Sequence, residues 1–317
     1  MSIGTSGNIL AYSTNGINWT GRGSTNMPNN ATGIAYNSDN NLWVAVGGGG
    51  SYSFSYSNNA INWTMLGGYS YPILSPIKVT YSSNQKLWVA VGGGGVNSIA
   101  YSNNAIKWTG ITGTTIFSDA YNVAYSSLQD IWVACGYDTA TNTTIAYSKD
   151  GINWTRTSNA YFNETGYGSC NCATYSVNQD IWVACGYGAS INKISFAYSK
   201  DGINWTGISN SALLIGSASC VAYSENQKLW VVSGSGGGFG TVNTFAYSKN
   251  GIVWTSVPFQ SDSAGYALAY SIYNNIWVSG ISSVSGFMYS TNGFNWTTLP
   301  ATKNISSVIN WIACNNL

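Results

Sequence analysis

The side chains able to do acid–base or nucleophilic chemistry are few in this sequence. Its 317 residues contain no histidine and only 10 acidic side chains. Without histidine, neither a Ser-His triad nor imidazole acid–base catalysis is available. A glycosidase needs two facing carboxylates, and a pair among the loop residues Asp119, Asp138, Glu164 and Asp262 stays open. We expect no enzyme, no cofactor and no metal site.

The six cysteines are the next candidates for chemistry. Five of them occupy shared positions of an internal repeat: Cys135, Cys185 and Cys314 at one, Cys172 and Cys220 at another. Other copies carry valine at the first of these positions, which marks a small apolar core site rather than a metal ligand. Cys170 stands alone. We predict reduced, buried thiols, with a disulfide or metal contact of Cys170 as the alternative.

The composition excludes several classes of partner. Charged residues make up 7% of the chain, against roughly 25% in ordinary soluble proteins. The net charge is +1 without a cluster of Lys and Arg, so no basic stripe for nucleic acid is present. No apolar run reaches the length of a membrane span, so we expect no membrane insertion. The start of the sequence lacks the features of a signal peptide, and the localisation stays undecided.

Two phrases alternate along the chain and must position any site. The first reads Ala-Tyr-Ser-Lys-Asp-Gly-Ile-Asn-Trp-Thr at 146–155, and the second Ala-Tyr-Ser-Glu-Asn-Gln-Lys-Leu-Trp-Val at 222–231. Together they contain all 14 tryptophans. The repeat has the length of a propeller blade, and its Tyr, Trp, Val, Ile and Thr content favours strands.

The spacing within each phrase indicates a hairpin. Tyrosine precedes tryptophan by seven residues, as in Tyr12/Trp19 and Tyr81/Trp88. An odd separation places two residues opposite each other across a short turn, here the four residues 14–17. We therefore predict that each half-repeat is closed by a Tyr–Trp cross-strand pair.

Two hairpins per repeat predict an all-β, seven-bladed β-propeller with four antiparallel strands per blade. The whole chain, 1–317, forms a single domain in this interpretation. The expected blades cover 33–66, 77–111, 121–157, 171–208, 219–257, 266–299, and 306–316 together with 7–21. The last blade is closed by N- and C-terminal strands, two from each end, which leaves no free sheet edge.

The first phrase, Ser-x-(Asp/Asn)-(Gly/Ala)-x-x-Trp, resembles the Asp-box (BNR) repeat of sialidase-like propellers, with one residue fewer before the tryptophan. The copies start at Ser13, Ser57, Ser102, Ser148, Ser199, Ser248 and Ser290. The resemblance implies a structural turn between the third and fourth strands of each blade. A sialidase would need three arginines, and this chain has only Arg22 and Arg156. The blade number and the short aromatic repeats also look like those of propeller lectins.

The variable loops on the face opposite the tight turns are the expected binding region. Aromatic rings beside polar donors suit sugars, so we expect a non-catalytic, multivalent carbohydrate-binding (lectin-like) propeller with glycans as partners. The alternative is a structural or protein-interaction propeller, a surface or virion component, with a protein partner on this loop face. The candidate ligand-binding residues are Tyr69, Tyr71, Tyr121, Tyr137, Asp138, Arg156, Tyr161, Glu164, Tyr187 and Tyr266.

Overall fold

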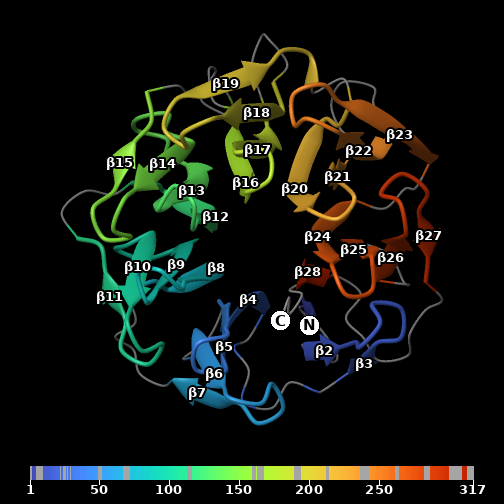
Figure 1. Ribbon diagram of the computed structural model, residues 1–317. Coiled ribbons are helices and arrows are strands. Elements are labelled where there is room, and N and C mark those ends of the chain that lie inside the picture. Colours follow the sequence, from blue (N-terminus) through green and yellow to red (C-terminus); the bar gives the residue numbers. More distant parts are fainter. Residues whose placement is uncertain are drawn as a thin grey trace.

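The protein is built from short antiparallel strands that follow the two phrases of the sequence. The computed structural model describes residues 2–4, 10–21, 23, 26, 28, 30–48, 52–66, 72–112, 116–158, 162, 168–188, 194–211, 214–235, 243–260, 264–281, 286–299 and 309–312. Four consecutive strands form a meander, here called a unit, and the units surround a common axis (Figure 1).

The first three complete units are β4 (Ala31–Asn37), β5 (Leu42–Gly47), β6 (Phe54–Ser57) and β7 (Thr64–Leu66); β8 (Ser75–Ser82), β9 (Leu87–Gly93), β10 (Ile99–Ser102) and β11 (Thr109–Gly110); and β12 (Asp119–Ser126), β13 (Ile131–Tyr137), β14 (Ile145–Ser148) and β15 (Thr155–Arg156). The next three are β16 (Ser169–Ser176), β17 (Ile181–Tyr187), β18 (Phe196–Ser199) and β19 (Trp205–Ile208); β20 (Ser217–Ser224), β21 (Leu229–Ser235), β22 (Asn243–Ser248) and β23 (Thr255–Gln260); and β24 (Gly265–Ser271), β25 (Ile276–Ile281), β26 (Phe287–Ser290) and β27 (Thr297–Thr298). Strands from both ends of the chain make up the remaining unit.

The described strands are hydrogen-bonded into six sheets, five of four strands and one of eight. The eight-stranded sheet contains the β16–β19 and β20–β23 units, which are joined where Tyr187 of β17 pairs with Ser217 of β20. The first strand of each unit lies nearest the axis, and β4, β8, β12, β16, β20 and β24 follow one another around it (Figure 1). The architecture is therefore all-β and propeller-like, as the repeat predicts.

The terminal unit differs from its prediction in how the two ends share it. Its sheet has the order β28-β1-β2-β3, with β1 (Ser2–Gly4), β2 (Leu10–Tyr12), β3 (Thr20–Gly21) and β28 (Ile309–Ile312). Ser2 pairs with Ile312, so the two ends of the chain do close one sheet. The N-terminal end supplies three strands and the C-terminal end one, rather than two each, because residues 2–4 form a strand that carries no repeat signature.

The two phrases form different hairpins. In the second phrase tyrosine lies directly opposite tryptophan as predicted, for example Tyr81 opposite Trp88. In the first phrase the prediction is wrong: Tyr147 pairs with Thr155, and Ser199 pairs with Trp205. The turn has one residue more than expected because the side chains of Ser and Asx bind its backbone. At Asp150, for example, the carboxylate accepts hydrogen bonds from Ile152 N at 2.9 Å and Asn153 N at 2.7 Å.

Several first-phrase tryptophans pack against a phenylalanine of the preceding unit instead of against the tyrosine of their own hairpin. Trp108 packs on Phe54 of the preceding unit with ring centroids 4.6 Å apart, and Trp296 stacks on Phe245 at 4.0 Å. Trp19 of the terminal unit stacks on Phe287 of the β24–β27 unit at 4.4 Å. These aromatic contacts help to hold neighbouring units together around the ring.

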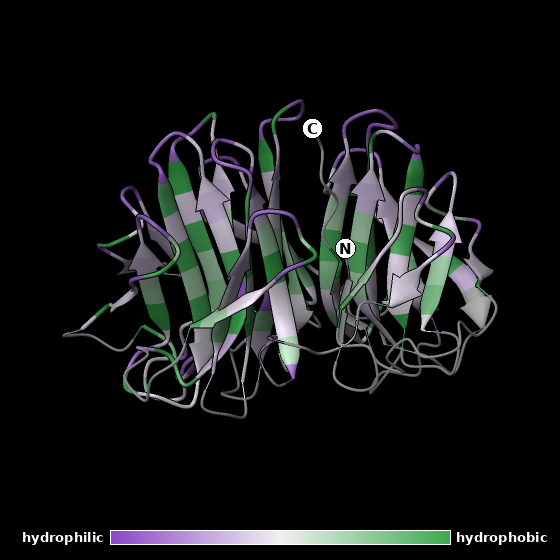
Figure 2. Ribbon diagram, turned by 90° about the horizontal axis from the view of Figure 1, so that it is seen from below, coloured by the Kyte–Doolittle hydropathy of each residue, from purple (hydrophilic) through white to green (hydrophobic). Residues whose placement is uncertain are grey.

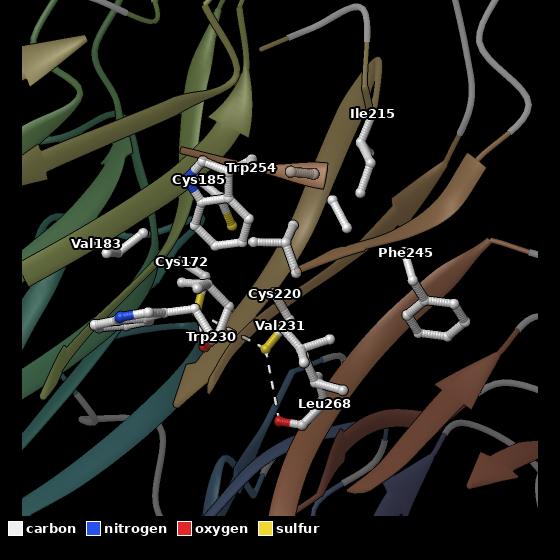
Figure 3. Close-up of a cluster of buried hydrophobic side chains, with 14 of the residues drawn as sticks. Cys172, Val183, Cys185, Ile215, Cys220, Trp230, Val231, Phe245, Trp254 and Leu268 are labelled. Atoms are coloured by element: carbon white, nitrogen blue, oxygen red, sulfur yellow. Dashed lines mark hydrogen bonds between the residues drawn. The ribbon is translucent and has the colours of Figure 1, made fainter. Parts of the chain in front are cut away.

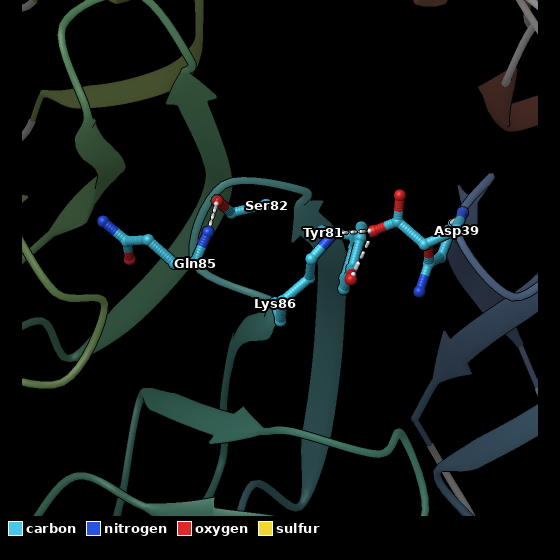
Figure 4. Close-up of polar contacts among 6 residues, drawn as sticks. Asp39, Tyr81, Ser82, Gln85 and Lys86 are labelled. Carbon is cyan, nitrogen blue, oxygen red and sulfur yellow. Dashed lines mark hydrogen bonds and ion pairs between the residues drawn. The ribbon is translucent and has the colours of Figure 1, made fainter.

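Because consecutive strands alternate in direction, the turns of both phrases share one face of the ring, here called the turn face. A glutamine in this face joins its own unit to the next one: Gln85 accepts a hydrogen bond from Trp132 Nε1 at 2.8 Å and donates to Asp130. Gln129, Gln179 and Gln227 accept the indole hydrogen bond of the next unit in the same way. Figure 4 shows how Tyr81 and Lys86 reach Asp39 of the preceding unit, at 2.8 and 2.9 Å.

The core lies within and between the units. Hydrophobic residues fill the strands, while the turns of one face are hydrophilic (Figure 2). The second-phrase tryptophans Trp132, Trp182, Trp230 and Trp277 are completely buried. In the described ranges, no helix is long and apolar enough to cross a membrane.

Candidate functional site

A β-bulge interrupts the first strand of each complete unit close to the loop face, which lies opposite the turn face. Two residues of the inner strand face one residue of its neighbour, so the intervening residue leaves the regular pairing. These bulge residues are Thr32, Ile77, Tyr121, Asn171, Ser219 and Tyr266. The position is structurally constant but varies in residue type, and two of the predicted ligand-binding residues, Tyr121 and Tyr266, occupy it.

Tyr121 belongs to a cluster with Asp119 and Tyr137, here called the Asp119 cluster. Asp119 begins β12 and Tyr137 ends the adjacent β13, and the two are direct pairing partners. The Tyr137 hydroxyl donates a hydrogen bond to Asp119 Oδ2 at 2.9 Å. The rings of Tyr121 and Tyr137 lie 5.9 Å apart at an interplanar angle of 31°. All three side chains are half-buried, so the cluster combines one carboxylate with two partly accessible aromatic rings.

The position of Asp119 depends on a glycine of the preceding unit. A Cβ atom added to Gly93, at the end of β9, would lie 1.5 Å from Asp119 Oδ1. Any other residue at this position would therefore displace the carboxylate. The Asp119 cluster thus lies at a junction between two units, where the glycine leaves the space that the carboxylate occupies.

Electrostatics define what the Asp119 cluster can hold. Burial raises the pKa of Tyr121 to about 12, and the charge of Asp119 contributes. The hydrogen bond to Asp119 is the main reason that the pKa of Tyr137 is raised. Both tyrosines are therefore neutral phenols at neutral pH. Between described residues, Asp119 accepts a hydrogen bond only from Tyr137 and forms no ion pair, although a carboxylate can accept about four.

Two other predicted residues, Asp138 and Arg156, interact with each other through their charges next to the loop that follows β13. Asp138 is buried and accepts hydrogen bonds from Ser118 Oγ at 3.0 Å and from the backbone and hydroxyl of Thr141. Burial raises its pKa, but these hydrogen bonds and the charge of Arg156 outweigh the burial and lower the pKa below its usual value. Asp138 therefore remains ionised and fixes the loop after β13, with Arg156 of β15 as a favourable charge nearby.

Two of the remaining predicted residues, Tyr187 and Tyr266, are described by the structure and lie on other units than the Asp119 cluster. Tyr187 ends β17 at the position equivalent to Tyr137, and its side chain is exposed. Its partner across the strand pair is Ser169 instead of an aspartate. Tyr266 is exposed at its own bulge in β24. The other predicted residues, Tyr69, Tyr71, Tyr161 and Glu164, lie outside the described residues.

Sequence reasoning missed the residues nearest the axis. Directly after the bulge, equivalent positions carry Gly33, Lys78, Asn122, Cys172, Cys220 and Ala267. Lys78 is almost completely buried, and burial lowers its pKa to about 7, although Cys172 and Cys220 act in the opposite direction and raise it. A signal was present in the repeat alignment, where one lysine stands among small and neutral residues. Within the described part of the chain, no three His, Cys, Asp or Glu side chains are placed to hold a metal ion.

Comparisons with known proteins support the architecture. No protein-family model matches the sequence, and no curated protein matches it. Solved structures do match in fold: a Lactobacillus plantarum protein has a TM-score of 0.66 at 10% identity and covers 92% of this chain and 90% of its own. A 6-phosphogluconolactonase-like protein from Bacteroides uniformis reaches 0.61 at 10% identity, covering 88% and 87%. A virginiamycin B lyase from Staphylococcus aureus reaches 0.64 at 11% identity, covering 87% and 85%.

These neighbours correct the functional expectation drawn from the sequence. They define a class, the propeller-like all-β proteins, and at identities near 10% they show the fold alone. Two of these three neighbours are named as a lactonase-like protein and a lyase, and none of the three as a lectin. The expectation of a non-catalytic, carbohydrate-binding propeller is therefore wrong. It relied on loop aromatics and on a resemblance of repeats, and neither distinguishes a sugar site from other polar sites on the same scaffold.

Proposed function

We propose that the Asp119 cluster binds a small organic cation, an amine or quaternary ammonium group, at the loop face of the ring. The observation that carries the proposal is a half-buried carboxylate beside two neutral phenol rings with no cationic partner between described residues. A cation within about 6 Å of an aromatic ring is attracted by its negative face, and the carboxylate adds a direct ion pair.

The proposal concerns binding and, as a second candidate activity, turnover of the bound cation. The second candidate draws on the structural neighbours that are named as enzymes. Ligand and substrate sites of α/β and barrel scaffolds gather on loops at one face, and the Asp119 cluster has that location here. Tyr137 and Asp119 form a hydrogen-bonded pair that can pass a proton to or from a bound group.

We also propose that the ring consists of seven blades in one domain, 1–317, with each blade beginning one or two residues before the start expected from the sequence and with residues 2–4 added to the terminal blade. Support comes from the eight-stranded sheet, which contains two four-stranded units joined at Tyr187 and Ser217. The Asp-box-like interpretation of the first phrase is supported by its turn, in which Ser148 Oγ accepts a hydrogen bond from Gly151 N at 2.9 Å. The Trp154 indole then donates to the Gly151 carbonyl at 3.1 Å.

The binding proposal is tested with a cation and its neutral isostere. We expect choline to bind the purified protein and 3,3-dimethyl-1-butanol, which has the same shape without the charge, to bind at least tenfold more weakly. Isothermal titration and saturation-transfer NMR measure both. In Asp119→Asn, which keeps the shape of the side chain, the affinity for choline should fall about tenfold, the effect of roughly 1.4 kcal/mol.

A matched control separates the local charge from the net charge. Asp39→Asn removes one negative charge from the turn face, where Asp39 contacts Lys86 and Tyr81, and should leave choline binding unchanged. Equal binding of choline and its isostere, or an Asp119→Asn protein that binds like the wild type, would refute the proposal.

The second candidate, turnover of the bound cation, is tested separately. The protein is incubated with a mixture of amines and the mixture is followed by NMR. Unchanged spectra over a day would refute turnover.

A further inference from the structure

Two pairs of buried thiols connect neighbouring units near the axis. The Cys170 thiol of β16 donates to the sulfur of Cys135 in β13, with the two sulfurs 2.8 Å apart. On the other side of β16, Cys172 and Cys220 of β20 have their sulfurs 3.8 Å apart. Figure 3 shows Cys172 and Cys220 among the buried side chains between the β16–β19 and β20–β23 units. All four cysteines are buried and free.

The β-bulge at Asn171 explains why one strand presents a thiol to each neighbour. Residues two apart in a regular strand share one face of the sheet. Here Cys170 pairs with Gly186 and Cys172 with Cys185, so two steps along β16 correspond to one step along β17. The bulge therefore turns the two thiols to opposite sides. Cys170 faces the β12–β15 unit and Cys172 faces the β20–β23 unit.

The two sulfur contacts differ in how close they are to a covalent bond. A disulfide has a sulfur–sulfur length of about 2.05 Å. The Cys135 and Cys170 sulfurs, at 2.8 Å, need to approach by less than about 1 Å. The Cys172 and Cys220 sulfurs, at 3.8 Å, need to approach by about 1.8 Å in a packed inter-unit contact. The first pair therefore needs the smaller displacement to reach the length of a disulfide, and the second needs a larger one within a packed contact.

We propose that Cys135 and Cys170 form a disulfide between units when the chain folds in the presence of a disulfide donor, and that Cys172 and Cys220 remain thiols. One cysteine, as the thiolate, attacks glutathione disulfide and releases one glutathione thiolate. The second cysteine loses its proton and attacks the protein-bound sulfur of this mixed disulfide, which releases the second glutathione. Two electrons pass from the protein to one glutathione disulfide.

The folded protein should react slowly, which places the reaction during folding. Burial raises the pKa of Cys135 and raises that of Cys170 well above its usual value. A buried thiol is seldom ionised, and the thiolate is the reactive form. Before the β12–β15 and β16–β19 units pack together, both thiols are accessible to glutathione. Packing then holds the sulfurs together and shields the new bond from reduction.

The experiment is oxidative refolding followed by peptide mapping. The denatured, reduced protein is refolded over a series of glutathione redox ratios, trapped with N-ethylmaleimide and digested without reduction. The maleimide is added under denaturing conditions, so that buried thiols react as well. We expect Cys172 and Cys220 to carry the maleimide. The peptide containing Cys135 and the peptide containing Cys170 and Cys172 should be linked, with a mass about 2 Da below the sum of the same two peptides when Cys135 and Cys170 are free thiols and the other cysteines are alkylated. Alkylated Cys135 and Cys170 in fully refolded protein at every redox ratio would overturn the proposal, and so would a Cys172–Cys220 link in their place.

The repeat supplies a matched variant. Ala218 of β20 pairs with Gly234 in the same way as Cys170 of β16 pairs with Gly186. In the unit before Ala218, Cys185 of β17 occupies the position that Cys135 of β13 occupies in the unit before Cys170. Ala218→Cys should therefore give a second linked peptide, to Cys185. Cys170→Ala should abolish the first link and Cys172→Ala should retain it. If Ala218→Cys refolds to the native spectrum without linking to Cys185, the geometric argument is wrong.

Discussion

The glutamine found in four of the second-phrase turns should carry much of the stability between the units that it joins, and Gln129 provides the sharpest test. Its amide oxygen accepts a hydrogen bond from Trp182 Nε1 at 2.9 Å. Its amide nitrogen donates to Asp180 Oδ1 at 2.8 Å and to the carbonyl of Lys200 at 2.7 Å. One side chain thus connects its own unit to two turns of the next unit.

The effect of Gln129→Ala can be estimated from these bonds. Each is worth a net 0.5–1.5 kcal/mol, and leaving the buried indole N–H of Trp182 without a partner adds about 1–3 kcal/mol. Part of the exposed amide contribution is recovered by water, so we expect a loss of about 2–4 kcal/mol. With an unfolding entropy of about 2.1 cal/mol/K per residue, the 317 residues give a fall in Tm of roughly 3–6 °C.

Scanning calorimetry and urea denaturation measure this loss. Leu128→Ala, at the exposed neighbouring position, is the control and should change Tm by less than about 1 °C. A double-mutant cycle of Gln129→Ala with Trp182→Phe isolates the indole hydrogen bond, and we expect a coupling energy of at least about 0.5 kcal/mol. A Gln129→Ala protein as stable as Leu128→Ala, or a coupling energy of zero, would refute the reasoning.

Two further predictions concern the first-phrase turns. Burial raises the pKa of Asp150, but hydrogen bonds from Asn153 and Ile152 outweigh it and lower the pKa to about 2. The stabilisation is therefore present above the ordinary carboxyl pKa of about 4 and is lost as the pH falls toward 2. Asp150→Asn, which introduces the residue found in other copies, should flatten the decline of the urea midpoint between pH 4 and 2, and an unchanged slope would contradict this assignment. Gly151→Ala should destabilise by about 1–2 kcal/mol, because Gly151 has φ +70° and a Cβ would lie 2.6 Å from Leu87 Cδ2. Urea denaturation checks it, and a midpoint equal to that of the wild type would show that the turn relaxes.

Particular residues show where sequence reasoning succeeded and failed. The odd Tyr–Trp spacing gave the correct pairing in the second phrase, as at Tyr81 and Trp88. The same spacing failed in the first phrase, because the Ser and Asx side chains take up backbone donors and lengthen the turn. Tyr121 and Tyr137 were expected at a binding face and do lie together. Asp119 was recognised only as a loop carboxylate, since its position against Gly93 belongs to two different units.

The sequence by itself determined the strand content, the repeat and the division into hairpins, because side-chain alternation and turn chemistry act over a few neighbouring residues. It also singled out Cys170 as the cysteine without a counterpart in the repeat. The tertiary structure alone decided which side chains of different units meet. Cys170 reaches Cys135 over 35 positions of sequence because a bulge rotates one side chain toward the preceding unit. That rotation depends on the packing of inner strands around the axis, a geometry that no local pattern of residues specifies.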